Sequence, residues 1–413
     1  LGDVYKRQGT AADANTVYAS AGIAGLDSEN VTISDTTLAA TVLNTLDGYT
    51  TGVVNASSVN TLTGAAGDLV TAYAANTAGT ISGLGDGAAT VNSGTASVAQ
   101  VNTLASATSG TLTASVTEGD MATLANISES GNALTVTVTD SSVAADALNT
   151  LNGKTTVAVT VNSATITGAV SDVNAAYAAD AAGTISGLGD EAVTLSDTSI
   201  VASVLNTTNG YTTGVVNASS VNTLTGAAAD MNTAYAANAA GTISGLANEA
   251  ITLSDTTLVA SVLNTLDGYT SGVIDASNLT LLTGTLSDIQ AAQASSGISN
   301  LGGVPTTVTG SLTVAQANAE AAATTGVVTA TITDGDMATL ANLQEEGNAY
   351  TITITDTVVD CAALNALNLK TTVAIDASAI LTLTGTAADA NTAYNSNSAG
   401  TITGLGNEAI TLE

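Results

Sequence analysis

The sequence predicts an α/β repeat solenoid, in which parallel strands stack in strand–helix coils of about 22 and about 36 residues. Three observations point to this fold class: a signature that recurs along the chain, short pieces that alternate apolar residues with Thr, and helical pieces between them. A β-solenoid, in which the helical pieces are only turns, is the alternative.

The first eight residues stand apart from the rest of the chain. Residues 3–8 read DVYKRQ, which is the translation of GATGTGTATAAGAGACAG, a transposon end used in sequencing. The string GTAADANT begins at Gly9 and recurs from Gly385 to Thr392, so the repeat pattern starts at Gly9. We therefore expect residues 1–8 to be a sequencing-adapter artefact and both native termini to lie outside this fragment.

The recurring signature divides the rest into modules. It reads GLGDGAATV at Gly83, GLGDEAVTLSD at Gly187, GLANEAITLSD at Gly245 and GLGNEAITL at Gly404. The expected order is a partial repeat (9–24), a short module (25–82), a long module (83–186), two short modules (187–244 and 245–300), a long module (301–403) and a truncated repeat (404–413).

The strand-like pieces alternate with a period of two residues. LTVTVTD (134–140) and YTITITD (350–356) place apolar residues on one face and Thr on the other, which is typical of a half-buried strand. Such a piece and a short helix together have the length of one coil of a leucine-rich-repeat-like solenoid, so we expect consecutive strands to stack in parallel.

The helical pieces have an apolar stripe and recognisable ends. In TTLVASVLNTLDG the stripe consists of Leu258, Val262, Leu263 and Leu266. We expect Asp255 or Thr256 at the N-cap and Gly268 at C′. In the second helix type, Thr386 and Asp389 have the spacing of a capping box.

The charge balance excludes two classes of partner. The chain has 35 acids and 4 bases, a net charge of −31; without Asp3, Lys6 and Arg7 the counts are 34 and 2, which gives −32. A nucleic-acid or anionic membrane surface needs a basic stripe, which is absent. No apolar run has the length of a membrane span, so we expect neither nucleic acid nor membrane insertion.

Acids at the strand ends form the first candidate site. They are Asp35, Asp140, Asp197, Asp255, Asp334, Asp356 and Asp376. A row of carboxylates attracts cations, and Ca²⁺ prefers oxygen ligands, so Ca²⁺ is the one cofactor that we consider. The densest pairs, Glu118 with Asp120 and Asp334 with Asp336, are the metal candidates. Helix N-capping is the alternative role for these acids.

Outward Thr residues form the second candidate site. The predicted ligand face consists of Thr135, Thr137 and Thr139, and of Thr351, Thr353 and Thr355. Regular Thr rows resemble the ice-binding surfaces of antifreeze proteins, but Asn55 and Asp376 would interrupt them. The alternative is that Thr simply favours exposed strand positions.

Tyr and Lys share a slot after the helices. Tyr49, Tyr211 and Tyr269 occupy it in short modules, and Lys154 and Lys370 occupy it in long ones. An aromatic ring there could contact a sugar face, whereas packing against the next coil is the alternative.

Nothing in the sequence points to catalysis. There is no His, the commonest general acid–base, and Cys361 is the only Cys. By repeat alignment Cys361 occupies the helix position of Ala145, so we expect a buried structural residue. We expect that the chain is not an enzyme.

The units TLTGTAADANTAY, GTISGLGDEAVTLSD and VLNTLDGYT resemble tandem repeats of very large secreted or cell-surface proteins of marine bacteria, of cyanobacterial type. The resemblance covers nearly all of residues 9–413 and implies a role in adhesion, surface layers or motility. We therefore expect a non-catalytic, extracellular or cell-surface structural or adhesive segment, stiffened by Ca²⁺, with neighbouring repeats or cell-surface glycan as partners. The alternative is a ligand-binding solenoid that binds ice or glycan through Thr or Tyr rows.

Overall fold

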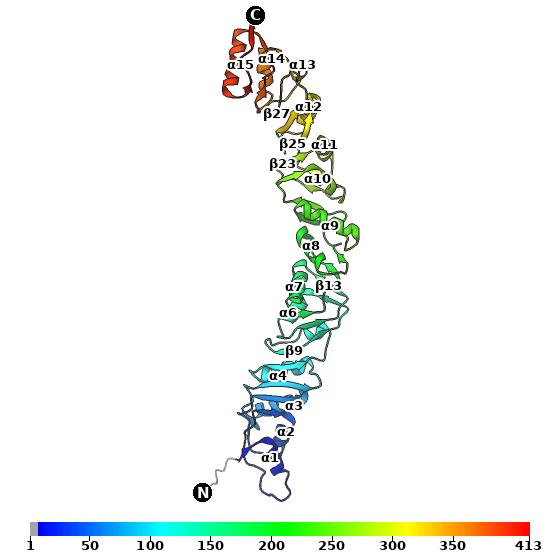
Figure 1. Ribbon diagram of the computed structural model, residues 1–413. Coiled ribbons are helices and arrows are strands. Elements are labelled where there is room, and N and C mark those ends of the chain that lie inside the picture. The colour runs from blue at the N-terminus through cyan, green and yellow to red at the C-terminus, as the bar shows by residue number, and fades with distance from the viewer. Residues whose placement is uncertain (1–6) are drawn as a thin grey trace. The chain divides into compact units, whose positions relative to one another are not determined.

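The computed structural model describes residues 7–413, so residues 1–6 of the predicted adapter segment lie outside the described residues. The chain divides into unit 1 (Leu1–Asp197 and Thr207–Asn217) and unit 2 (Thr198–Asn206 and Ala218–Glu413). In each unit short parallel strands alternate along the chain with helices, so the fold is α/β (Figure 1). The predicted module boundaries stay a prediction.

In unit 1 the described strands form four parallel stacks. The first stack has the order β1 (Arg7–Gly9), β2 (Val31–Ile33), β4 (Val54–Asn55), β6 (Ile81–Ser82), and the second has the order β3 (Thr37–Ala39), β5 (Thr61–Ala65), β7 (Ala88–Ser93), β8 (Leu112–Ser115), β9 (Ala133–Thr135). The third has the order β10 (Thr137–Val138), β12 (Val159–Val161), β14 (Ile185–Ser186). The fourth has the order β11 (Ser142–Ala144), β13 (Thr165–Gly168), β15 (Ala192–Leu195), β17 (Val216–Asn217). The helices are α1 (Ala11–Tyr18), α2 (Ala40–Tyr49), α3 (Ala66–Ala78), α4 (Val98–Ala107), α5 (Met121–Leu124), α6 (Ala145–Asn152) and α7 (Val170–Ala181). The division between the units runs through α8 (Ala202–Tyr211).

Unit 2 repeats the same arrangement. Its first stack has the order β16 (Ser199–Val201), β18 (Thr223–Gly226), β20 (Ala250–Leu253), β22 (Ile274–Asp275), β24 (Ile298–Ser299), and its second has the order β21 (Thr257–Val259), β23 (Leu281–Gly284), β25 (Thr306–Leu312), β26 (Val328–Ile332), β27 (Ala349–Thr351). The third has the order β28 (Val358–Asp360), β30 (Thr382–Gly385), β32 (Ala409–Leu412), and the fourth pairs β29 (Ile375–Asp376) with β31 (Ile402–Thr403). Unit 2 also contains β19 (Ile243–Ser244). Its helices are α9 (Ala228–Ala240), α10 (Ala260–Asp267), α11 (Leu286–Ala294), α12 (Val314–Ala323), α13 (Met337–Leu340), α14 (Cys361–Asn368) and α15 (Ala387–Ala399). Helices therefore stand where the β-solenoid alternative expects only turns.

The stretch of chain between two paired strands is called a coil here. Val31 of β2 pairs with Val54 of β4, and Thr61 of β5 pairs with Ala88 of β7. The described pairings join residues 20 to 28 positions apart. The predicted coil of about 36 residues is therefore wrong, because the stretch that it spans contains further strands and a helix, such as β5, α3 and β6 between β4 and β7.

The core consists of small and branched aliphatic side chains. In α2, Leu43 and Leu46 are fully buried, and so is Val54 of β4 in the next coil. Along β26, buried residues alternate with exposed Thr, as the period-two pattern predicts. Burying one such aliphatic side chain contributes about 1.5–3 kcal/mol, so thin layers without Phe or Trp can still hold the coils together.

The helices of the VLNTLDG type begin later than the sequence predicts. The N-cap of α10 is Val259, not Asp255 or Thr256, because Thr257–Val259 forms β21 and pairs with Leu281–Thr283. Gly268 is the C-cap at φ −72°, not a left-handed C′ residue. In the second helix type the predicted capping box is confirmed in part: Thr386 is the N-cap of α15, and its Oγ1 accepts a hydrogen bond from the Asp389 backbone N at 3.2 Å. The Asp389 carboxylate accepts from Thr386 Oγ1 at 2.6 Å and not from the Thr386 backbone N, so the reciprocal bond of a capping box is not formed.

Some glycines lie where consecutive coils approach each other too closely to admit a side chain. A Cβ atom on Gly52 would lie 2.3 Å from the carbonyl oxygen of Glu29, and one on Gly272 would lie 2.2 Å from that of Glu249. Neither glycine has a left-handed φ, so the requirement is space and not backbone conformation. Of the helices described, none is both long and apolar enough to cross a membrane.

Candidate functional site

The four predicted metal ligands lie at helix N-termini. Glu118 Oε2 accepts a hydrogen bond from the backbone N of Val98, the first residue of α4, at 3.0 Å. Asp120 is the N-cap of α5, and its Oδ1 accepts from the Thr123 backbone N at 2.9 Å. In the second long module the same contacts join Asp334 to Val314 at 2.7 Å and Asp336 to Thr339 at 2.9 Å.

These capping bonds favour the ionised carboxylates. Hydrogen bonds from Thr123 hold the pKa of Asp120 below its usual value, and those from Thr339 do the same for the pKa of Asp336. Within residues 7–413 no three or more His, Cys, Asp or Glu side chains gather closely enough to hold a metal ion. The Ca²⁺ assignment of Glu118, Asp120, Asp334 and Asp336 stays a prediction.

The other strand-end acids cap the helix of the preceding coil. Asp255 Oδ2 accepts from the backbone N of Ala228, the first residue of α9, at 2.8 Å across 27 residues. The same bond, at 2.7 Å, joins Asp35 to Ala11, Asp140 to Met121, Asp197 to Val170 and Asp356 to Met337. Asp376 differs, because it accepts from Ser378 in its own turn. Capping is thus the observed contact of these acids, but it joins two coils instead of closing one helix.

A ladder of helical Asn side chains, which the sequence reading missed, joins one helix to the helix of the next coil. Asn264 Nδ2 donates to the carbonyl oxygen of Asp288 in α11 at 2.9 Å. The equivalent bonds join Asn44 to Asp68, Asn149 to Asp172, Asn206 to Asp230 and Asn365 to Asp389. The signal was the recurrence of Asn between the apolar positions of successive helices, where an unbonded amide would be costly.

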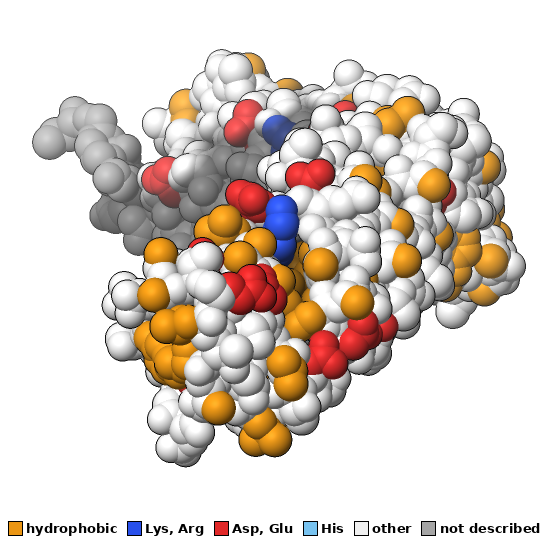
Figure 2. Space-filling view, turned by 90° about the horizontal axis from the view of Figure 1, so that it is seen from above, with side chains coloured by type: hydrophobic (Ala, Val, Ile, Leu, Met, Phe, Trp, Pro, Cys, Tyr) orange, Lys and Arg blue, Asp and Glu red, His pale blue; other side chains and the backbone are white. Residues whose placement is uncertain are grey.

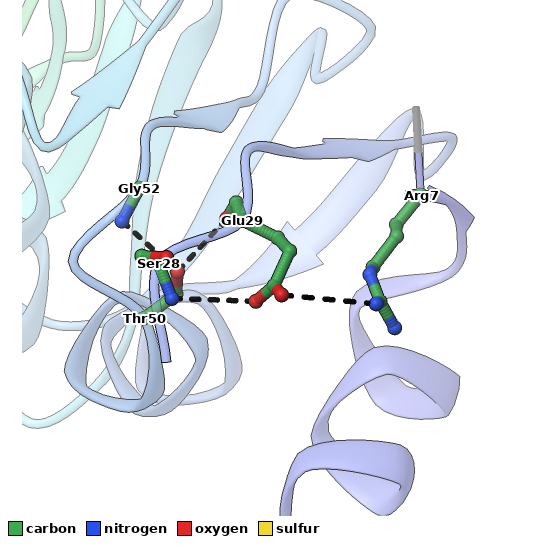
Figure 3. Close-up of polar contacts among 5 residues, drawn as sticks. All are labelled: Arg7, Ser28, Glu29, Thr50 and Gly52. Carbon is green, nitrogen blue, oxygen red and sulfur yellow. Dashed lines mark hydrogen bonds and ion pairs between the residues drawn. The ribbon is translucent and has the colours of Figure 1, made fainter. Parts of the chain in front are cut away.

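A buried Thr after several of the helices binds the loop of the preceding coil. Thr50 Oγ1 donates to the carbonyl oxygen of Glu29 at 2.8 Å and accepts from the Gly52 backbone N at 3.0 Å (Figure 3). Thr270 forms the same pair of bonds with Glu249 and Gly272. Figure 3 also shows Arg7 beside the Glu29 carboxylate, with nitrogen and oxygen 3.8 Å apart. If residue 7 comes from the adapter, as the sequence predicts, this ion pair is foreign to the repeat.

The Tyr slot makes intramolecular contacts. Tyr211 stacks on Tyr177 with ring centroids 5.4 Å apart, and Tyr269 stacks on Tyr235 in the same way. The buried partners are further tied to acids: Tyr177 Oη donates to Glu191 Oε2 at 2.9 Å. One face of each slot ring is thus covered, but Tyr211 keeps 38% of its surface exposed.

The two Lys residues of the slot also bind the preceding coil. Lys154 Nζ donates to the carbonyl oxygen of Ser128 at 2.9 Å, and Lys370 Nζ donates to that of Gln344 at 3.0 Å. Both acceptors follow a one-turn helix, α5 or α13. Cys361 is the buried first residue of α14, as Ala145 is of α6, so its predicted position is confirmed.

The predicted Thr face lies outward. Thr135 and Thr139 are exposed and Thr137 is half-buried, while Thr351, Thr353 and Thr355 are all exposed. Across strands, Thr351 neighbours Thr331, but Thr353 neighbours Asp376. The acid that was predicted to interrupt the Thr rows therefore does stand in one.

Two polar hollows recur at equivalent places in the long modules. One of ≈ 250 Å³ is lined by the turn Thr108–Thr111 after α4 and by Glu129 and Asn132. The other, of ≈ 410 Å³, follows α12 in the second long module and is lined by Thr324–Gly326, Glu345, Glu346 and Asn348. On the face seen in Figure 2, acidic side chains are scattered among uncharged ones, and the few basic side chains lie beside acids.

No known protein family, curated protein or solved structure matches the chain.

Proposed function

We propose that the chain is a non-catalytic structural or adhesive segment of a larger extracellular protein, folded as a solenoid of strand–helix coils. The observation that carries the proposal is that polar side chains repeatedly join one coil to the next. The strand-end Asp, the helical Asn and the buried Thr each bond to the backbone of a neighbouring coil, as Asp255, Asn264 and Thr270 do. Such bonds suit a chain whose task is to keep its shape under load.

The distribution of charge agrees with an extracellular role. With 35 acids and 4 bases, the negative charges of the chain repel one another in dilute salt. Salt at about 0.1 M screens this repulsion beyond about 10 Å. A saline exterior therefore favours this composition. The resemblance to repeats of marine bacterial surface proteins supports the same location.

A pulling experiment tests the structural role. Residues 9–413, tethered at both ends, should resist force and then lengthen in steps. A coil of 20 to 28 residues releases about 65–100 Å when it is extended at about 3.3–3.6 Å per residue. Extension without measurable resistance would contradict a structural segment.

Calcium stiffening is tested separately by thermal unfolding followed by circular dichroism. Millimolar Ca²⁺ should raise the midpoint by several degrees, and a chelator should reverse the rise. In the variant Glu118→Gln/Asp334→Asn the helix caps keep an oxygen acceptor but lose charge, so the rise should shrink. An unchanged midpoint in the parent chain would contradict calcium stiffening and leave a structural spacer that does not bind Ca²⁺.

A second candidate function, glycan binding, is favoured by the two equivalent polar hollows and by the half-exposed slot Tyr rings. Their hydroxyl, carboxylate and aromatic groups are those that bind sugars. A glycan array probed with residues 9–413 and with Tyr49→Ala/Tyr211→Ala distinguishes the two functions. Binding that is lost in the variant supports glycan recognition, and inhibition of ice growth would instead favour the Thr rows.

A further inference from the structure

One place in unit 2 departs from the apolar core of the repeats. Glu320 of α12 is completely buried, with 0% of its surface exposed. Aligning α12 (VAQANAEAAA) with α4 (VAQVNTLASA) of the first long module places Leu104, which is also completely buried, at the equivalent position. A carboxyl group therefore stands where the repeat calls for an aliphatic side chain.

The neighbours of Glu320 are altered as well. Gln293 of α11 stands in the helix position that holds Tyr73, Tyr177 and Tyr235 elsewhere, and buried Thr306 of β25 completes the group. Gln293 Nε2 donates to Glu320 Oε1 at 3.0 Å, and Thr306 Oγ1 donates to the same oxygen at 3.2 Å. Four elements of the fold thus supply one polar cluster, because Tyr350 of β27 also lies beside it.

Two oxygen atoms of this cluster have no partner. Glu320 Oε2 and Gln293 Oε1 are both buried and form no hydrogen bond with any described group. Each is an acceptor when the carboxyl group is ionised, so neither can satisfy the other. A buried acceptor left unpaired costs about 1–3 kcal/mol, and a charged one costs more.

A buried Glu elsewhere in the chain shows the contrast. Glu249 is also completely buried, but its Oε2 accepts from Tyr235 Oη at 2.8 Å and both its oxygens accept from the Ala247 backbone N at 3.0 Å. That environment supplies donors to a carboxylate. The environment of Glu320 supplies donors to one oxygen only.

No described positive charge compensates Glu320. Tyr350 is the titratable group that faces it, and its hydroxyl donates to the Ala317 carbonyl oxygen at 3.4 Å. The negative charge of Glu345 also acts on Tyr350, and Asp288 at the start of α11 is hydrogen-bonded to Thr285. Lys370, the Lys of the same long module, is paired with Glu346.

We propose that Glu320 is a buried proton-binding site: its carboxyl group keeps its proton at pH values where exposed glutamates are ionised, and Oε2 donates that proton to Gln293 Oε1. One proton then satisfies both orphaned oxygens and completes a cyclic acid–amide pair with the Gln293 Nε2 bond. Burial, which raises the pKa of the Glu320 carboxyl, acts in the same direction.

The site makes the stability of unit 2 depend on pH. Because the pKa is raised in the folded chain, the stabilisation is complete below the unfolded pKa of about 4.3 and is lost as pH rises through the folded pKa. Raising the pH should therefore loosen the packing of α12 against α11 and β25. The segment then contains one pH-sensitive joint among coils whose buried Glu residues are fully bonded.

The test compares residues 9–413 with the variant Glu320→Gln, whose amide can form the same cyclic pair at every pH. Thermal midpoints should coincide near about pH 4, and the parent should fall below the variant as pH rises. The gap should reach about 3–5 °C for each unit by which the pKa is raised, because one unit corresponds to about 1.4 kcal/mol. The matched control Glu249→Gln should instead lower the midpoint, because its amide NH₂ would face backbone and Tyr donors.

Infrared spectroscopy supplies an independent readout. The parent should retain one carboxylic-acid C=O band at about pH 6, above the ordinary Glu pKa of about 4.3, and Glu320→Gln should lack it. Glu320→Leu restores the residue type of Leu104 and has no carboxyl group at this position. Its thermal midpoint should therefore follow that of Glu320→Gln in its dependence on pH, without the fall expected for the parent. A midpoint gap that stays constant with pH, together with no acid band in the parent, would overturn the proposal and show an ionised Glu320.

Discussion

Removing one inter-coil cap should loosen one helix end. In Asp255→Ala the backbone N–H of Ala228, the first residue of α9, loses its acceptor at 2.8 Å. Losing a hydrogen bond to a charged acceptor and leaving the donor unpaired costs about 1–2 kcal/mol, and the carboxylate also loses its interaction with the helix dipole. Because a difference of this size changes an equilibrium about 5- to 30-fold, the Ala228 amide should exchange its hydrogen faster by that factor.

Native-state hydrogen exchange with residue resolution measures this effect. Asp255→Asn, which keeps an oxygen acceptor but no charge, should give an intermediate rate. Amides of α10, the helix that follows Asp255, should change less than those of α9, since Asp255 does not cap its own helix. If α10 loosened instead of α9, or if the Ala228 rate were unchanged, the assignment of inter-coil capping would be refuted.

Two further predictions concern glycine and tyrosine. Gly52→Ala should destabilise unit 1 by about 1–3 kcal/mol in urea unfolding, because its Cβ would lie 2.3 Å from the Glu29 carbonyl oxygen, whereas the control Gly48→Ala, in open space within α2, should stabilise by about 0.5–1 kcal/mol. A neutral Gly52→Ala would mean that the coils do not approach so closely. Tyr177→Phe should cost about 1–2 kcal/mol, because the buried Glu191 loses a donor at 2.9 Å. Burial and the Glu191 charge raise the Tyr177 pKa, so the stabilisation from its hydroxyl is present below about pH 10 and should be lost as pH rises above that value. Tyr177→Phe has no hydroxyl and should not show this loss. Unfolding curves at alkaline pH that run in parallel for the parent and the variant would contradict the prediction.

Local patterns along the chain were readable from the sequence. The period-two alternation in residues 134–140 and 350–356 predicts their alternating burial, and the spacing of Thr386 and Asp389 predicts the N-cap of α15. The position of Cys361 at a helix start follows from its alignment with Ala145. The alternation and the cap depend on residues within a few positions of one another, whereas the position of Cys361 depends on the repetition of the sequence.

Features that depend on the neighbouring coil were missed. Thr257–Val259 reads as the start of a helix, but pairing with Leu281–Thr283 holds it as a strand, so tertiary bonding overrides local propensity. Asp255 was expected to cap the helix that follows it, and its actual partner lies 27 residues earlier. The cluster around Glu320 was missed because its members come from four separate elements.

The direction of the Asp caps has a consequence for synthesis. Ala228 receives its partner only from Asp255, so the first turn of α9 cannot be completed until 27 further residues have left the ribosome. The same delay applies at Ala11, Met121, Val170 and Met337, whose partners follow 19 to 27 residues later. The first turns of these five helices therefore gain their caps only after the next coil has been made, so this part of their order follows translation by one coil.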